Sequence, residues 1–251
     1  MSAAYKSVLE MVREKVEKTP EYREVEYTPD HWVLLAELRR TAGELMSVLA
    51  SRGLYSVVHG SIARGDVHEK SDIDVFIPYV ISSFKLEQVL EDAGLKVYSR
   101  TIIMATPQST PKAYYALDPE ERVVISYPLA KLKPREIEFY KFGGMLELEE
   151  LERGVRKPGV NKKLVLIVPS EKGHLEAPVI GFESYVARVI GVSVDTVLER
   201  VRVLTRRDEV GRTGVFLKIN VPSTLSIEEA LAEETTRNQY LRRVLVEADL
   251  L

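Results

Sequence analysis

The sequence of 251 residues contains no cysteine and few side-chain amides. Without cysteine the chain can form no disulfide, offers no thiol nucleophile and cannot ligate zinc through sulfur. Its amides are confined to six positions: Asn161, Asn220, Asn238, Gln88, Gln108 and Gln239. Because Asn and Gln are thermolabile, their scarcity beside many Glu, Lys and Arg residues indicates a heat-adapted source.

Long apolar runs are missing as well. No stretch approaches the roughly 20 residues that span a bilayer. Residues 1–18 intersperse charged side chains such as Lys6 and Glu10 with apolar ones, so they lack the uncharged core of a signal peptide. A hydrophobic content of 45% excludes disorder throughout, and a net charge of −3 excludes a uniformly positive surface. We therefore expect a soluble, cytoplasmic protein with no membrane partner.

The spacing of apolar residues predicts a mixture of helices and strands. Caps and turn residues set the bounds, as in Thr28-Pro29-Asp30, where an N-cap oxygen precedes a proline and an acid. The expected elements are helix 1–18, helix 28–53, strand 54–58, strand 73–77, helix 82–95, strand 97–104, hairpin strands 113–117 and 122–127, strand 164–168, and one helix from Ser226 towards Ala248. Such a series suits a mixed sheet backed by helices.

The most informative stretch is residues 57–76, VVHGSIARGDVHEKSDIDVF. Asp72 and Asp74 alternate with apolar residues, so on a strand they share one face, roughly 7 Å apart at the backbone. Two such carboxylates repel each other unless a cation lies between them. Hard oxygen ligands favour Mg²⁺ or Mn²⁺ over zinc. We therefore expect a divalent-metal site at these two residues.

A polyphosphate site is expected beside this metal site. Gly60 allows a phosphate to approach the backbone closely, and the Ser61 hydroxyl can bind its oxygens. Arg64 adds a planar cationic fork, and Ser71, at the end of the same loop, is a fourth candidate for nucleotide binding. A Walker-type loop is excluded, because Asp66 and Val67 stand where Lys and Ser or Thr are required.

The pattern apolar–Gly–Ser, ten residues, then Asp–apolar–Asp–apolar resembles the signature of the DNA polymerase β-like nucleotidyltransferase superfamily. The fuller string GSIARGD…SDIDV is most similar to its small prokaryotic branch, which includes predicted archaeal nucleotidyltransferases. The resemblance implies transfer of a nucleoside monophosphate from an NTP, with ATP the expected nucleotide, to an unidentified acceptor, with release of pyrophosphate. It also implies Mg²⁺ or Mn²⁺ at Asp72 and Asp74 and triphosphate at Gly60 and Ser61.

The superfamily usually has a third carboxylate on a later strand, as metal ligand and general base. Here the best-matching strand, residues 123–127, has Ser126 where an acid is expected. Glu138, in an alternation of acidic and apolar residues, is the first candidate for the missing catalytic acid. Asp118 and Glu121 are alternatives, although both look like turn residues.

The C-terminal third has the spacing of a helix-turn-helix, with Gly191 at the turn. Arg200, Arg202, Arg206 and Arg207 follow on the second helix, and residues 209–221 resemble the β-wing of a winged helix. These arginines could contact nucleic-acid phosphates, although neighbouring acids offset part of the charge. The acceptor could accordingly be a nucleic acid, whereas a helix pair with a glycine turn is also a common packing unit.

The predicted fold class is α/β (α+β): a mixed β-sheet with helices of the nucleotidyltransferase type, followed by a mainly helical domain resembling a winged helix. The expected organisation is N-terminal helices packing on the core (1–53), a nucleotidyltransferase core (54–152), a basic linker (153–163) and a C-terminal domain with a terminal helix (164–251). Two alternative functions stay open. One is a non-catalytic, nucleotide-sensing regulator that binds nucleic acid; the other is an antitoxin-like partner role.

Overall fold

The computed structural model describes residues 19–211 and 214–247, so the helix expected over 1–18 lies outside the described part. A seven-stranded sheet forms its centre, in the order β11-β4-β5-β6-β3-β2-β7. Its strands are β2 (Val57–His59), β3 (Ile73–Phe76), β4 (Ser99–Met104), β5 (Lys112–Ala116), β6 (Val123–Pro128), β7 (Met145–Glu147) and β11 (Leu217–Asn220). Strands β3 and β6 are parallel and the other pairs antiparallel, which confirms the mixed sheet.

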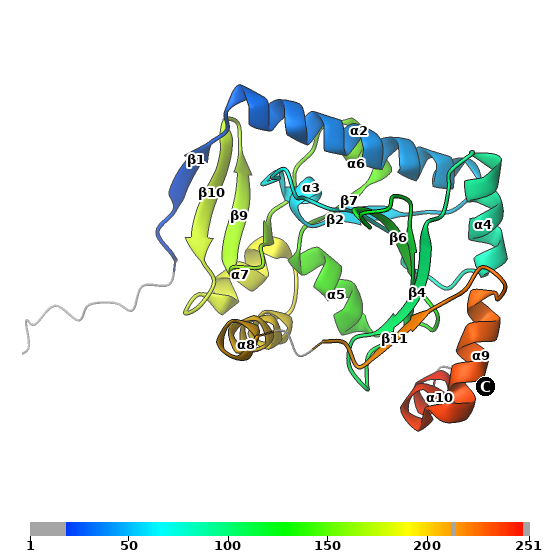
Figure 1. The fold of residues 1–251 in the computed structure, drawn as a ribbon. Helices are drawn as coiled ribbons and strands as arrows, with labels where there is room; N and C mark the ends of the chain where they lie inside the picture. The colour runs from blue at the N-terminus through cyan, green and yellow to red at the C-terminus, as the bar shows by residue number, and fades with distance from the viewer. Residues whose placement is uncertain (1–18, 212–213, 248–251) are drawn as a thin grey trace, which may run out of the picture.

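One face of this sheet is buried under two helices, α2 (Pro29–Ser51) and α4 (Ser83–Asp92). Helix α2 begins as predicted, with the Thr28 hydroxyl accepting a hydrogen bond from the His31 N–H at 3.3 Å. It runs along one side of both sheets (Figure 1). The core beneath it joins helix residues such as Leu45 and Leu49 to strand residues such as Val75 and Ile125. Because side chains alternate along a strand, the strand residues next to Val75 and Ile125 point to the opposite face of the sheet.

A second, four-stranded sheet has the order β1-β10-β9-β8. Its strands are β1 (Arg23–Glu26), β8 (Gly159–Val160), β9 (Val165–Ser170) and β10 (Gly173–Pro178), and its core continues into α7 (Glu183–Ile190) and α8 (Val194–Val210). The sequence patterns did not predict β1, which pairs with β10 across almost 150 residues. Four residues, three of them charged, carry little strand signal, and pairing with the distant partner stabilises them.

Of three shorter helices, the one that carries Tyr140 lies on the second face of the large sheet, and the other two pack against α2. They are α3 (Ser61–Arg64), α5 (Pro134–Phe142) and α6 (Leu148–Glu152). The alternation of acidic and apolar residues around Glu138 lies on helix α5 and not on a strand. Pro134 stands in the first turn, and Glu136 accepts a hydrogen bond from the Lys133 N–H at 3.0 Å, so local capping starts a helix there.

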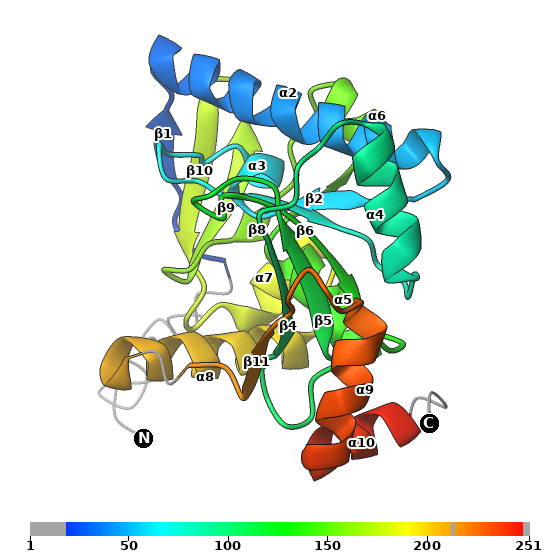
Figure 2. The ribbon, with the colours of Figure 1, turned by 45° about the vertical axis from the view of Figure 1, so that its right-hand side comes forward.

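The C-terminal segment differs from the prediction in two ways. The expected wing is not confirmed, because β11 pairs with β4 as the edge strand of the seven-stranded sheet. Where one terminal helix was expected, the structure has two, α9 (Ile227–Arg237) and α10 (Gln239–Val246), as Figure 2 shows. Asn238 separates them, since its side chain accepts hydrogen bonds from the N–H groups of Tyr240 and Leu241 and caps a new helix. The capping box at Ser226 is confirmed.

Residues 153–163, expected as a linker, lie directly against the loop that follows β2. The Lys157 N–H donates to the Ala63 carbonyl at 3.0 Å, and Gly159 belongs to β8. A Cβ on Gly159 would lie 2.5 Å from the Gly144 nitrogen and 2.6 Å from the Gly143 carbonyl carbon. Only glycine fits this approach of two backbones. The predicted domain boundaries stay predictions.

We predict that Gly159→Ala lowers the free energy of unfolding by about 2 kcal/mol or more, because the added methyl meets backbone that cannot rotate away. Gly43→Ala is the matched control: it lies inside α2, and its added Cβ would meet only Leu151 Cδ2 at 3.7 Å. Gly43→Ala should raise the free energy of unfolding by about 0.5–1 kcal/mol. Urea unfolding measures both. Equal stabilities of the two variants would contradict the tight contact at Gly159.

Candidate active site

The first part of the site is the turn between β2 and α3. Gly60 has φ 82° and ψ −144°, a backbone conformation that side-chain-bearing residues rarely adopt. Its N–H donates to the Gly144 carbonyl at 2.9 Å, and Ser61 follows as the first residue of α3. A Cβ on Gly60 would meet nothing within 4 Å, so the space in front of this turn is open. The turn can thus present Ser61 and its backbone to a ligand.

Two side chains of α2 fix the loop behind this turn. The Arg39 guanidinium in α2 donates to the carbonyls of Ile62 and Ala63, with Arg39 Nη2 2.9 Å from the Ile62 oxygen. The His31 Nε2 atom lies 2.8 Å from the Gly65 carbonyl oxygen. Burial is the main cause that lowers the pKa of Arg39, to about 10, so this arginine stays charged at neutral pH.

Asp72 and Asp74 lie at the start of β3, on the face opposite the core under α2. Ile73 and Val75 between and after them are buried, whereas Asp72 is exposed and Asp74 half-buried. The alternation of a strand therefore places both carboxylates on the same side. The strand register, continued by one pair from Val58↔Val75, sets His59 across from Asp74. These carboxylates follow the Gly60–Ser61 turn by way of one short loop.

Ser71 and Arg64, both expected to bind nucleotide, make internal contacts. The Ser71 hydroxyl accepts from the His68 N–H at 3.0 Å and from the Ser61 hydroxyl at 3.2 Å, so it shapes the loop. Arg64 is buried and forms a bidentate ion pair with Asp66, with its Nε 2.9 Å from Oδ1 and its Nη2 3.0 Å from Oδ2. Its Nη1 donates to the Gly143 carbonyl at 2.5 Å. In this arrangement the Arg64 fork is used by the protein itself.

The structure does not bring Glu138 to the two aspartates. Its carboxylate accepts hydrogen bonds from the Ser193 N–H at 3.2 Å, the Ser193 hydroxyl at 2.6 Å and the Thr196 hydroxyl, at the start of α8. The Ser193 and Thr196 hydroxyls hold the pKa of Glu138 below its usual value. A carboxylate so held ties α5 to the N-cap residue of α8, Ser193, and is a weaker base than an ordinary glutamate.

The alternatives for a third acid serve as turn residues. Asp118 accepts hydrogen bonds from the N–H groups of Arg122 and Val123, and Glu121 from the Ser99 hydroxyl. Val124 stands beside Asp74 on the parallel neighbour β6. Within residues 19–211 and 214–247, no three His, Asp or Glu side chains are grouped as a metal ion would require.

Several groups on the carboxylate face were not assigned a role from the sequence. Lys112 and Tyr114 project from β5, and the Tyr140 ring of α5 stacks on Phe76 with centroids 3.8 Å apart. Burial, and then the Asp74 charge, raise the pKa of Tyr114 to about 12, so its phenol keeps its proton. Burial is also the main cause that lowers the pKa of His59. Strand register, which joins these residues, is not readable from local sequence.

Residues 49–163 match the family model of the nucleotidyltransferase domain. This segment is a nucleotidyltransferase domain. It contains both aspartates, the Gly60–Ser61 turn and the close glycine contact around Gly159. No curated protein matches the chain in sequence. A chain of the "structure of GLD-2/RNP-8 complex" aligns with 18% identity and a TM-score of 0.26, over 41% of this chain and 42% of that one.

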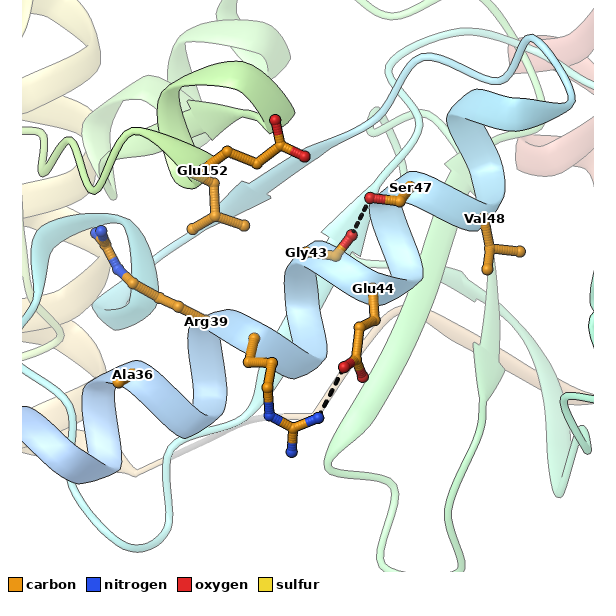
Figure 3. A pocket seen from close by; sticks show the side chains of 9 residues that line it. Ala36, Arg39, Gly43, Glu44, Ser47, Val48 and Glu152 are labelled. Carbon is orange, nitrogen blue, oxygen red and sulfur yellow. Dashed lines mark hydrogen bonds and ion pairs between the residues drawn. The ribbon is translucent and has the colours of Figure 1, made fainter.

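A depression of about 620 Å³ lies away from the aspartates, on the outer side of the nucleotidyltransferase domain between α2 and α6. Figure 3 shows Arg39, Gly43, Ser47 and Glu152 around it. Arg40 and Glu44 also line it and form an ion pair with each other. Neither Asp72, Asp74 nor the Gly60–Ser61 turn lines it. No helix of the described residues is both long and apolar enough to cross a membrane.

We predict that Asp66→Ala lowers the free energy of unfolding by about 3–5 kcal/mol, because it leaves the buried Arg64 cation without its partner. Glu44→Ala removes the exposed partner of Arg40 and should cost less than about 0.5 kcal/mol. Thermal or urea unfolding of both variants measures the difference. A loss below 1 kcal/mol for Asp66→Ala would contradict the strong buried pair between Arg64 and Asp66.

Proposed function

We propose that the protein is an Mg²⁺-dependent nucleotidyltransferase that moves a nucleoside monophosphate from an NTP to an acceptor and releases pyrophosphate. One observation carries the proposal: two aspartates share the open face of β3 beside a glycine turn, inside a nucleotidyltransferase domain. The aspartates are the proposed metal ligands, and Gly60 and Ser61 the proposed triphosphate-binding pair.

The donor set fits Mg²⁺ or Mn²⁺. Both prefer hard oxygen ligands, and Mg²⁺ is usually bound by one or two carboxylates together with substrate phosphates and water. Asp72 is exposed and Asp74 half-buried, so both remain accessible to a hydrated ion. When bound, the ion would neutralise phosphate charge and lower the pKa of the attacking oxygen.

The backbone of the Gly60–Ser61 turn would bind the triphosphate without rearranging, and the Ser61 hydroxyl would turn from Ser71 towards a phosphate oxygen. This backbone is fixed by the Gly144 carbonyl, and the α3 backbone behind it by Arg39 and Lys157. Such fixed donors lose little conformational entropy when an anion binds. Because Ser71 and Arg64 make internal contacts, we assign them a supporting role: they would hold the loop in the binding geometry.

The transfer forms one bond and breaks one. An acceptor oxygen attacks the α-phosphorus, and the bond to the oxygen bridging the α- and β-phosphates breaks, so that pyrophosphate leaves with that electron pair. The proton of a hydroxyl acceptor passes to solvent. Positioning and charge neutralisation supply most of the catalysis in such reactions. We assign Glu138 no part in this step, since its carboxylate accepts hydrogen bonds from Ser193 and Thr196 at the start of α8.

We predict that Asp72→Asn combined with Asp74→Asn abolishes Mg²⁺-dependent NTP binding and lowers transfer at least about a hundredfold, because the metal loses both anionic ligands. Asp92→Asn is the control. Asp92 lies on α4, which covers the opposite face of the sheet, so this variant should leave NTP binding and transfer unchanged. Calorimetry with each NTP measures binding, and α-labelled NTP with a cell extract reveals the acceptor. Unchanged metal dependence in the double variant would refute the proposal.

A further inference from the structure

A lysine ammonium lies on the same face as the two aspartates. Ser126 of β6 pairs with Phe76 of β3 on one side and with Tyr114 of β5 on the other. Lys112 lies two residues before Tyr114 and Phe76 two residues after Asp74, so alternation puts all these side chains on one face. The contact of Lys112 Nζ with the Phe76 ring, 5.8 Å from its centroid, agrees with this register.

The ammonium of Lys112 is partly desolvated and has no anionic partner. It lies 5.1 Å from the Tyr140 ring centroid, so two aromatic rings flank it. No hydrogen bond or ion pair of its Nζ atom is found with the described residues, although the Glu136 charge acts on it at longer range. Glu136 instead accepts hydrogen bonds from the Thr110 N–H and hydroxyl.

A lysine in this setting is costly for the fold. Burial lowers its pKa, and the cation–π contacts offset only part of the lost hydration. Lysines with no functional role usually extend into water. Lys218, exposed on the edge strand of the same sheet, shows that ordinary arrangement. The position of Lys112 is therefore suited to an anion that comes from outside the chain.

The strand order tells which substrate the lysine would face. Strand β2 and the Gly60–Ser61 turn lie on one side of β3, and β6 and β5 lie on the other. In an in-line transfer, the leaving pyrophosphate and the attacking oxygen are on opposite sides of the α-phosphorus. With the triphosphate at Gly60 and Ser61, the acceptor approaches over β6 and β5. Lys112 belongs to β5, and its side chain reaches across β6 to the rings of Phe76 on β3 and Tyr140 on α5.

We propose that Lys112 binds a phosphate group of the acceptor and so orients the acceptor's attacking oxygen towards the metal site. The inference rests on the proposed function, which places the triphosphate. Asp74 and Phe76 are roughly 7 Å apart at the backbone, and Lys112 Nζ lies 5.8 Å from the Phe76 ring. A phosphate bound by Lys112 would act as an anchor for the acceptor. Tyr114, a neutral phenol between the two points, is placed to donate a further hydrogen bond.

Two sources can supply such a phosphate: a small phosphorylated molecule, or the phosphodiester next to the end of an RNA strand. Ribose 5-phosphate and a hexaribonucleotide are the probes, with uncharged ribose as the ligand control. Trace acetylation followed by mass spectrometry reports the reactivity of Lys112 directly, in the wild-type protein with Mg²⁺ and a non-reactive NTP analogue. Lys85, exposed on α4, is the internal control.

One phosphate probe should slow acetylation of Lys112 by about tenfold or more, as expected for a charged hydrogen bond, and leave Lys85 unchanged. Protection by ribose 5-phosphate indicates a small acceptor, and protection by the hexaribonucleotide alone indicates RNA. Lys112→Met should weaken binding of the effective probe by a similar factor and leave NTP affinity unchanged. Lys112→Arg should restore part of the binding, and Lys85→Met should have no effect.

Three results would overturn the inference. They are no protection by either phosphate probe, equal protection by ribose, and full protection by the NTP analogue alone, which would put Lys112 on the triphosphate side. Calorimetry on the same samples separates this failure from failure of the proposed function. Intact Mg²⁺-dependent NTP binding without protection refutes the lysine's role alone, and absent NTP binding refutes the proposed function and this inference with it.

Discussion

The site depends on one constraint: the backbone of residues 60–66 is tied to three separate segments. Helix α2 contributes Arg39 and His31, the turn after α5 contributes the Gly144 carbonyl, and the segment before β8 contributes the Lys157 N–H. Inside the loop, the Arg64–Asp66 pair is buried. Such a loop cannot relax into another conformation without losing several buried hydrogen bonds. The position of Ser61 relative to β3 follows from this network.

The local parts of the site could be predicted from the sequence because short-range physics sets them. Asp–apolar–Asp–apolar can bury its apolar residues only by turning both carboxylates to the other face, and this arrangement is found at Ile73 and Val75. The start of α2 at Thr28, the β5–β6 hairpin and the capping box at Ser226 follow from turn and cap chemistry in the same way.

The parts that failed depend on contacts between distant segments. Glu138 resembles a strand residue locally, yet the hydroxyls of Ser193 and Thr196, more than fifty residues away, determine its role. The segment around β11 has the composition of a wing, but β4 offers it a free sheet edge. The sequence shows Lys112 only as a single lysine in a strand, because its neighbours Phe76 and Tyr140 come from two other elements.

The central claim is that Asp72 and Asp74 together bind a divalent cation next to a triphosphate at Gly60 and Ser61. Crystals grown with Mn²⁺ and a non-reactive NTP analogue test it directly, because manganese has an anomalous signal. The account predicts a manganese peak in contact with oxygens of both aspartates and of the triphosphate, whose outer phosphates approach the Gly60–Ser61 turn. A manganese ion bound elsewhere, or carboxylates of Asp72 and Asp74 on opposite sides of β3, would contradict it.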